Sequence, residues 1–196
     1  MRPAEHLVPQ APPRERILAA AGELFYRHGI RAVGVDAIAE AAGTNKMTLY
    51  RHFGSKDLLV AEYIRTLAGE YERTWEKLSK EHPGDYKAQL SAWLRCAYDA
   101  GVDPLGRGCA VSNAAIELTE REHPARKIIA QAKQRLRERL AQLCSDAGFK
   151  EPEKIADEIF LLAEGAYASL VSLGPEGPGS RLLSLAEEIV KSAPCR

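Results

Sequence analysis

Apolar residues recur along most of the chain with the spacing of α-helices, and no stretch alternates with the period of two that a half-buried β-strand requires. The first example begins at Arg14 and ends at Gly29. Its apolar side chains fall at intervals of three and four residues, and they are Ile17, Leu18, Ala21, Leu24 and Phe25. Glycine and proline separate such segments, as they do between helices. The pattern predicts an all-α fold with about nine helices.

The first four predicted helices are closely spaced. A second helix over 35–42 follows Gly34, a third runs from Asn45 to about residue 52, and a much longer fourth follows Ser55. Asn and Ser are favourable N-cap residues, because their side chains accept hydrogen bonds from the first free amides of a helix. Five more helices are expected at roughly 85–100, 107–119, 124–147, 152–173 and 180–193.

Composition suggests how the chain is organised. Residues 1–13 contain four prolines and little that could pack, which predicts a flexible N-terminal arm. We expect a DNA-binding domain over 14–56 and a larger ligand-binding and dimerisation domain over 57–196. The chain has no net formal charge, but residues 1–56 carry eight Lys and Arg against five Asp and Glu. The N-terminal end is therefore mildly basic, and the rest is mildly acidic.

Several classes of protein are disfavoured by the sequence. No apolar run approaches the length of a membrane span, and the N-terminus lacks the apolar stretch of a secretory signal, so we expect a cytoplasmic protein without a membrane partner. The cysteines show no paired spacing, which argues against a metal site and a disulfide framework, and no cofactor is expected. They are Cys96, Cys109, Cys144 and Cys195.

Two short helices joined by a tight turn at Gly43 form the pattern of a helix-turn-helix, whose second helix lies in the major groove of DNA. The predicted second helix has Leu49 and Phe53 on one face. Its other face carries polar, basic and aromatic groups, which suit phosphates and base edges.

Two segments resemble a known DNA-binding signature. Residues 35–43 read Val-Asp-Ala-Ile-Ala-Glu-Ala-Ala-Gly, and residues 48–59 read Thr-Leu-Tyr-Arg-His-Phe-Gly-Ser-Lys-Asp-Leu-Leu. With Ala21, Leu24, Phe25 and Gly29 of the first helix, they are similar to the TetR family of transcriptional regulators. Further along, Arg107-Gly108-Cys109 followed by Asn113 and Glu117 resembles one common type of C-terminal domain in that family.

The resemblance implies that Lys46, Met47 and Thr48 face base edges and that Tyr50, His52 and Lys56 hold phosphates. Alternatively, Tyr50 and His52 brace the helical hairpin as a partly buried pair, and Lys56 is only a solvated charge. One departure is visible, because the family usually has Ser or Thr where this chain has Gly34. The complete predicted DNA-binding set is Asn45, Lys46, Met47, Thr48, Tyr50, Arg51, His52 and Lys56.

The resemblance also implies an unidentified small-molecule effector and a homodimer. The predicted ligand-binding residues are Trp93, Tyr98, Asn113, Glu117 and Tyr167, although ordinary packing or a place on the exposed surface is the alternative for each of them. The helix over 152–173 is apolar on more than one face, which favours a partner subunit, or else a central position in a monomer. The predicted interface residues are Phe160, Ala163, Tyr167, Leu170, Leu182, Leu185 and Ile189.

The leading hypothesis is a ligand-responsive regulator, with repression as the expected direction, that binds a palindromic double-stranded DNA operator as a homodimer and is not an enzyme. A competing hypothesis is an enzyme that uses Glu117 and His123 as an acid–base pair, but no nucleophile motif or phosphate loop accompanies them. A helical interaction module without DNA binding is the third. A further hypothesis is that Cys96 or Cys109 senses the redox state in place of a ligand. The commoner alternative is that both cysteines are structural.

Overall fold

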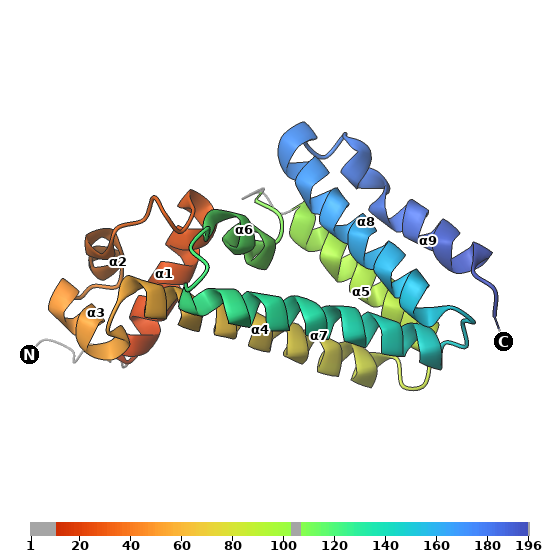
Figure 1. Ribbon diagram of the computed structural model, residues 1–196, viewed down its shortest axis with the longest axis horizontal. Helices are drawn as coiled ribbons and strands as arrows, with labels where there is room; N and C mark the ends of the chain where they lie inside the picture. The colour runs from red at the N-terminus through yellow and green to blue at the C-terminus, as the bar shows by residue number, and fades with distance from the viewer. Residues whose placement is uncertain (1–10, 103–106, 196) are drawn as a thin grey trace, which may run out of the picture. The chain divides into compact units, whose positions relative to one another are not determined.

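A computed structural model describes residues 11–102 and 107–195. Within these ranges the regular structure is helical, apart from one isolated antiparallel bridge between Phe149 and Cys195, and the predicted all-α class is confirmed (Figure 1). The helices are α1 (Pro13–His28), α2 (Val35–Ala41), α3 (Lys46–Phe53), α4 (Lys56–Glu81), α5 (Tyr86–Gly101), α6 (Ala110–Glu117), α7 (Pro124–Asp146), α8 (Pro152–Leu173), the 3₁₀-helix η1 (Pro178–Arg181) and α9 (Leu182–Ser192).

Internal contacts divide the chain into two compact units, one ending at Tyr63 and the other beginning at Ile64, so the boundary falls inside α4. The predicted boundary at residue 56 and the predicted roles of the two domains stay predictions. The predicted arm over 1–13 lies mostly outside the described residues. Within the described ranges, no helix combines the length and apolarity needed to cross a bilayer, and no group of His, Cys, Asp or Glu could hold a metal ion.

The N-terminal unit consists of α1, α2, α3 and the first turns of α4. In it, α1 packs against both α2 and α3, and α2 packs against α3. Phe25 of α1 meets Tyr63 of α4 at a ring-centroid distance of 5.6 Å. The buried side chains of this unit are Ile17, Ala21, Phe25, Ile30, Val33, Ile38, Ala39, Ala42, Leu49, Phe53, Leu59, Val60, Ala61 and Tyr63. This core fixes the position of α3.

The C-terminal unit contains the rest of α4 and the helices α5 to α9. In it, α7 packs along α8, and α5, α8 and α9 lie side by side (Figure 1). Trp75 of α4 and Trp93 of α5 stack with nearly parallel rings, their centroids 5.7 Å apart. The two rings belong to one apolar core, which continues to Phe149 and to Ile159 of α8.

Two predicted helices differ from the observed ones at their starts. The helix predicted at 107 begins at Ala110, because Gly108 has a positive φ of 63° and Cys109 is an extended N-cap. The helix predicted at 180 begins as η1, and its α-helical part starts at Leu182. Gly179 in η1 lies so close to α8 that a Cβ there would stand 2.8 Å from the carbonyl oxygen of Ala166.

Candidate nucleic-acid interface

The turn between α2 and α3 is tight because its backbone bonds back onto α2. The amide of Gly43 donates to the carbonyl of Glu40, and the amide of Thr44 donates to that of Ala39. Gly43 has a φ of 60°, in the left-handed region that favours glycine. Arg16 of α1 donates to the carbonyl oxygens of Ala42 and Gly43, at 2.9 and 3.3 Å, which ties the turn to the core of the unit.

Local side chains define where α3 begins. The side-chain oxygen of Asn45 accepts a hydrogen bond from the amide of Thr48 at 2.9 Å, which confirms the predicted N-cap. On the inner face of α3, Leu49 and Phe53 are buried. Arg14 of α1 places its guanidinium 5.2 Å from the centre of the Phe53 ring. The helix therefore presents a fixed outer face.

The outer face of α3 carries the predicted DNA-binding residues. Lys46, Met47, Tyr50, Arg51 and His52 are all exposed, and Thr48 is half-buried. The exposure of Tyr50 and His52 disfavours the alternative in which they form a buried bracing pair. The Met47 side chain is 76% exposed. Contact with a ligand or nucleic acid would remove this apolar surface from water.

Lys46 already has a partner on α2. Its ammonium lies 3.2 Å from a carboxylate oxygen of Asp36, and both groups are exposed. An exposed ion pair of this kind contributes little stability, because water and salt screen it. The lysine can therefore exchange Asp36 for another acceptor at small cost. Asp36 also brings a negative charge to this face, which would limit how strongly it attracts phosphates.

The N-terminal unit also contains the N-termini of α4 and α2. At α4, the hydroxyl of Ser55 accepts a hydrogen bond from the amide of Leu58 at 3.1 Å, which confirms the predicted cap, and Lys56 is the first helical residue. At α2, Gly34 is the N-cap and no side chain caps the helix. Helix N-termini favour anions, since their first amides lack partners within the helix. The free amides of α2 are therefore available to an external acceptor.

The ligand-binding residues predicted in the C-terminal unit divide into two groups. Trp93 and Tyr167 line a cavity of about 170 Å³. Tyr98 packs against the neighbouring core and is not part of the lining. Asn113 donates its amide to the carbonyl oxygen of Arg107 at 2.5 Å, and Glu117 lies 3.9 Å from the Arg107 guanidinium. Those two side chains hold the segment before α6 instead of facing the cavity.

The polar groups of the cavity come from residues that the sequence did not single out as ligand-binding. Lys133 of α7 and Glu164 of α8 form an ion pair at 2.6 Å on its wall, beside Cys109 and Tyr71. Nothing in the local pattern distinguishes this Lys and Glu from surface charges, because they meet only through the packing of α7 on α8.

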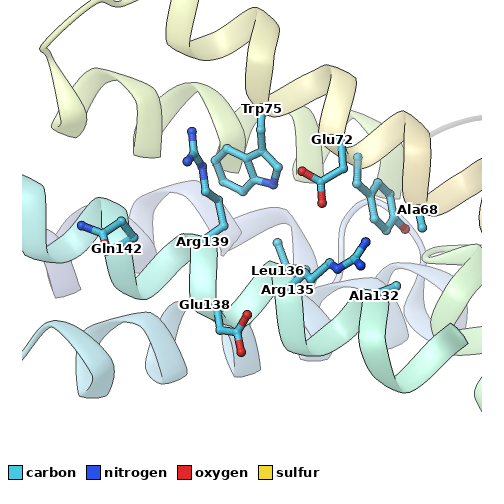
Figure 2. A pocket seen from close by; sticks show the side chains of 10 residues that line it. Ala68, Glu72, Trp75, Ala132, Arg135, Leu136, Glu138, Arg139 and Gln142 are labelled. Carbon is cyan, nitrogen blue, oxygen red and sulfur yellow. The ribbon is translucent and has the colours of Figure 1, made fainter. Parts of the chain in front are cut away.

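A second hollow, a groove of about 340 Å³, lies between α4 and α7. Figure 2 shows Trp75 and Glu72 on α4 facing Arg135, Leu136 and Arg139 on α7. Trp75 and Leu136, with Tyr71, line both the groove and the cavity. The two hollows are therefore neighbours that share part of a wall.

The predicted interface residues on α8 and α9 also divide into two groups. Ala163, Leu170 and Leu182 are buried within the chain itself, so they belong to its own core and add little to an outer surface. Phe160, Tyr167 and Ile189 are partly buried. Leu185 is exposed, and the apolar surface continues on α8 through Leu161, Gly165 and Ala168.

His123, proposed from the sequence as one half of an acid–base pair, has a structural role. Its Nδ1 accepts a hydrogen bond from the amide of Ala125 at 3.1 Å, which makes it the N-cap of α7. The predicted helix over 124–147 accordingly begins directly after it. The ring thus serves the same function as a capping Asn or Ser.

Comparison with known proteins gives similarities that centre on the N-terminal unit. Residues 17–63 match the family described as bacterial regulatory proteins, tetR family. The chain is 32% identical over 98 residues to the HTH-type transcriptional repressor KstR2 of Rhodococcus jostii (strain RHA1), a match that covers 50% of this chain and 48% of that protein. It is 45% identical over 49 residues to the HTH-type transcriptional activator FasR of Mycolicibacterium smegmatis, covering 25% and 22%. The matches thus span about half or less of these relatives.

Solved structures are similar over nearly the whole chain. A TetR-family transcriptional regulator from Streptomyces coelicolor superposes with a TM-score of 0.85 at 27% identity, over 91% of this chain and 94% of that one. The likeness includes the C-terminal unit, which the family match does not reach. The N-terminal unit thus matches the tetR family of bacterial regulatory proteins, and together with the likeness of the whole chain to a TetR-family regulator this supports a transcriptional regulator of that type.

Proposed function

We propose that the chain is a homodimeric transcriptional repressor, which acts in the cytoplasm, binds a palindromic DNA operator and changes its DNA affinity when a small molecule binds the C-terminal unit. The observation that carries this proposal is the outer face of α3. It combines exposed cationic, aromatic and apolar side chains on a helix whose opposite face is fixed in a core. Repression is favoured over activation because the longer of the two sequence matches is to a protein described as a repressor.

In this proposal α3 lies in the major groove. Lys46 would donate to guanine acceptors, and the methyl groups of Met47 and Thr48 would meet thymine methyl groups. Asn45 keeps its capping role at the start of the helix. Phosphates would be held by Tyr50, Arg51 and His52, together with Lys56 and the amides at the start of α4. In this division the first turn of α3 reads the base sequence. The phosphate contacts of the other residues fix the position of the protein along the DNA.

Dimerisation would set the spacing of two such helices. To enter successive major grooves, two recognition helices must lie about 34–36 Å apart. The apolar surface formed by Leu161, Gly165 and Ala168 of α8 with Leu185 of α9 would supply a symmetric four-helix interface. A hollow of about 230 Å³ beside Leu161 and Leu185 offers a place for a partner's side chain.

The effector would bind in the cavity lined by Trp93 and Tyr167. The dimer can adopt states that differ in the spacing of its two N-terminal units. A ligand that binds one of these states more tightly than the other weakens or strengthens DNA binding accordingly. Both tryptophans of the chain, Trp75 and Trp93, line this cavity. Their fluorescence would therefore report directly on its occupancy.

The test of DNA binding is a titration against a pool of genomic fragments, including the DNA upstream of the protein's own gene, at two salt concentrations with unrelated duplex as competitor. Tyr50→Ala should weaken binding, while Tyr86→Ala on α5 should not, although both side chains are 37% exposed. Wild-type binding should fall steeply with salt, because phosphate contacts release counterions. Equal effects of the two variants, or no sequence preference in any fragment, would reject the proposal.

The test of the dimer is sedimentation of Leu161→Arg, with Ile116→Arg on α6 as the matched control. The side chains of Leu161 and Ile116 are both largely exposed, at 68% and 78%. A charge buried without a partner in an apolar interface is strongly unfavourable, so only Leu161→Arg should sediment as a monomer. A wild-type monomer, or a Leu161→Arg dimer, would remove this face from the proposal.

A further inference from the structure

Cys109 lies at a meeting point of three helices in the C-terminal unit. It is the N-cap of α6, and its side chain lines the cavity with an exposure of only 9%. The Lys133 ammonium donates to its sulfur from 3.5 Å, and the hydroxyl of Tyr71 stands 3.4 Å from the same atom. The sulfur of Cys109 is thus at the centre of a polar cluster inside a largely apolar cavity.

An ammonium group, a phenol and a helix N-terminus surround this sulfur. Lys133 supplies a positive charge, and the N-terminus of α6 adds the positive end of a helix dipole. Burial, reinforced by Cys109, raises the pKa of Tyr71, so its phenol stays protonated and can donate to a sulfur anion. Glu164 holds Lys133 in place at 2.6 Å and is itself held by the hydroxyl of Ser112 at 2.6 Å.

The cavity limits what can reach the sulfur. A cavity of about 150 Å³ holds one benzene molecule, so a cavity of about 170 Å³ accepts a compound of one small ring or a short chain. Most of its wall is apolar or aromatic, from Trp75, Trp93 and Phe160 among others. Lys133 and Glu164 balance each other in charge, which favours a neutral compound.

We propose that Cys109 is a covalent capture site for small neutral electrophiles that carry a carbon–carbon double bond conjugated to a carbonyl group. In the reaction, the sulfur of Cys109 forms a bond to the β carbon as the carbon–carbon π bond breaks. The π electrons move onto the conjugated carbonyl, and the proton that the thiol loses is returned at the α carbon. No oxidant or reductant is consumed, and the Lys133 ammonium stabilises the sulfur anion before the attack.

Two of the other three cysteines provide internal references, whereas Cys96 is exposed but lines the same cavity as Cys109. Burial raises the pKa of Cys144 to about 11, and this thiol lies in the core with no exposed surface. Cys195 is exposed to solvent, so a reagent reaches it without entering any cavity. Preferential modification of Cys109 over Cys195 would therefore reflect its surroundings and not its access to solvent.

The experiment treats the full chain with but-3-en-2-one and follows each cysteine by peptide mass spectrometry. Cys109 should gain the mass of one probe molecule faster than Cys195, and Cys144 should stay unmodified. Lys133→Met should slow the reaction at Cys109 roughly tenfold and leave Cys195 unchanged, while Lys133→Arg keeps the rate. After unfolding, the preference for Cys109 should disappear. A Cys109 that reacts no faster than Cys195, or a Cys109 rate that is the same in Lys133→Met, would overturn the proposal.

The regulatory consequence rests on the proposed function, because it requires that a filled cavity changes operator binding. Treated wild-type protein should lose or gain operator affinity, whereas treated Cys109→Ser should not, and the saturated analogue butan-2-one should have no effect on either. An equal effect of butan-2-one would show a non-covalent effector and overturn the covalent trigger. If the untreated protein binds no DNA, the proposed function fails, while the adduct at Cys109 is still measured independently by mass.

Discussion

Replacing Gly34 by Ser tests whether the N-terminus of α2 faces a DNA phosphate. Gly34 is the N-cap of α2, with a φ of −82° and a ψ of 156°, and no side chain caps the helix. A Cβ at this position meets nothing within 4 Å, so Ser fits without strain or displacement of a neighbour. The substitution adds the hydroxyl that the family resemblance leads one to expect, and Gly34→Ala is the matched control that adds the Cβ alone.

The magnitude follows from two hydrogen bonds of one hydroxyl. As an acceptor it would cap a free amide of α2, which stabilises the helix by about 1 kcal/mol relative to Ala. As a donor it would bond a phosphate oxygen in the complex, worth about 1.5 kcal/mol for a charged acceptor. Operator affinity should therefore be roughly tenfold higher in Gly34→Ser than in Gly34→Ala.

Amide hydrogen exchange of residues 35–41 measures the first contribution, and operator titration at fixed salt measures the second. We expect slower exchange and tighter binding in the Ser variant. Slower exchange with unchanged affinity would refute the placement of the α2 N-terminus against the DNA backbone. Unchanged exchange would refute the capping geometry itself, since the two variants differ only by the hydroxyl.

Three further predictions concern stability. Gly43→Ala should destabilise the N-terminal unit by about 1–2 kcal/mol in urea unfolding, because a φ of 60° is unfavourable for Ala although its Cβ meets nothing; no loss would contradict the assigned turn. Leu49→Ala should cost about 2–5 kcal/mol in the same assay, since Leu49 is fully buried; a cost typical of surface positions would contradict its place in the core. A hydrogen bond from Arg137 lowers the pKa of Asp157 from its usual 3.8. The stability advantage of wild type over Asp157→Asn should therefore be present at neutral pH and be lost as acid titration passes below about pH 4; an advantage that persists in stronger acid would contradict the pairing.

The parts of the fold that depend on short-range rules could be predicted from the sequence. Asn45 and Ser55 cap helices, and Gly43 turns the chain between α2 and α3, because each acts on amides or backbone angles within three residues of itself. The predicted helix start was wrong where packing against a distant part of the chain determines it. The stretch around Gly179 forms η1, since the close packing of this segment on α8 controls its path.

The cavity could not be predicted in the same way. Asn113 and Glu117 are among the predicted ligand-binding residues, but Asn113 bonds to the Arg107 backbone and Glu117 pairs with the Arg107 side chain. The ion pair that does line the cavity joins Lys133 and Glu164, which are 31 residues apart. No periodicity in the sequence reports a contact between two helices, so the chemistry of the cavity depends on tertiary packing alone.

The apolar helix α8 shows what such packing adds to a sequence pattern. Apolar residues on most sides indicate that most sides are covered, but they do not say which side faces the chain's own core. Ala163 and Leu170 pack inside, whereas Leu161, Gly165 and Ala168 form a separate stripe on the exposed side. Small residues beside a leucine allow two helix backbones to approach closely while the leucine fills the space between them. The uncovered stripe of α8, and not its buried residues, is therefore where a partner helix would pack.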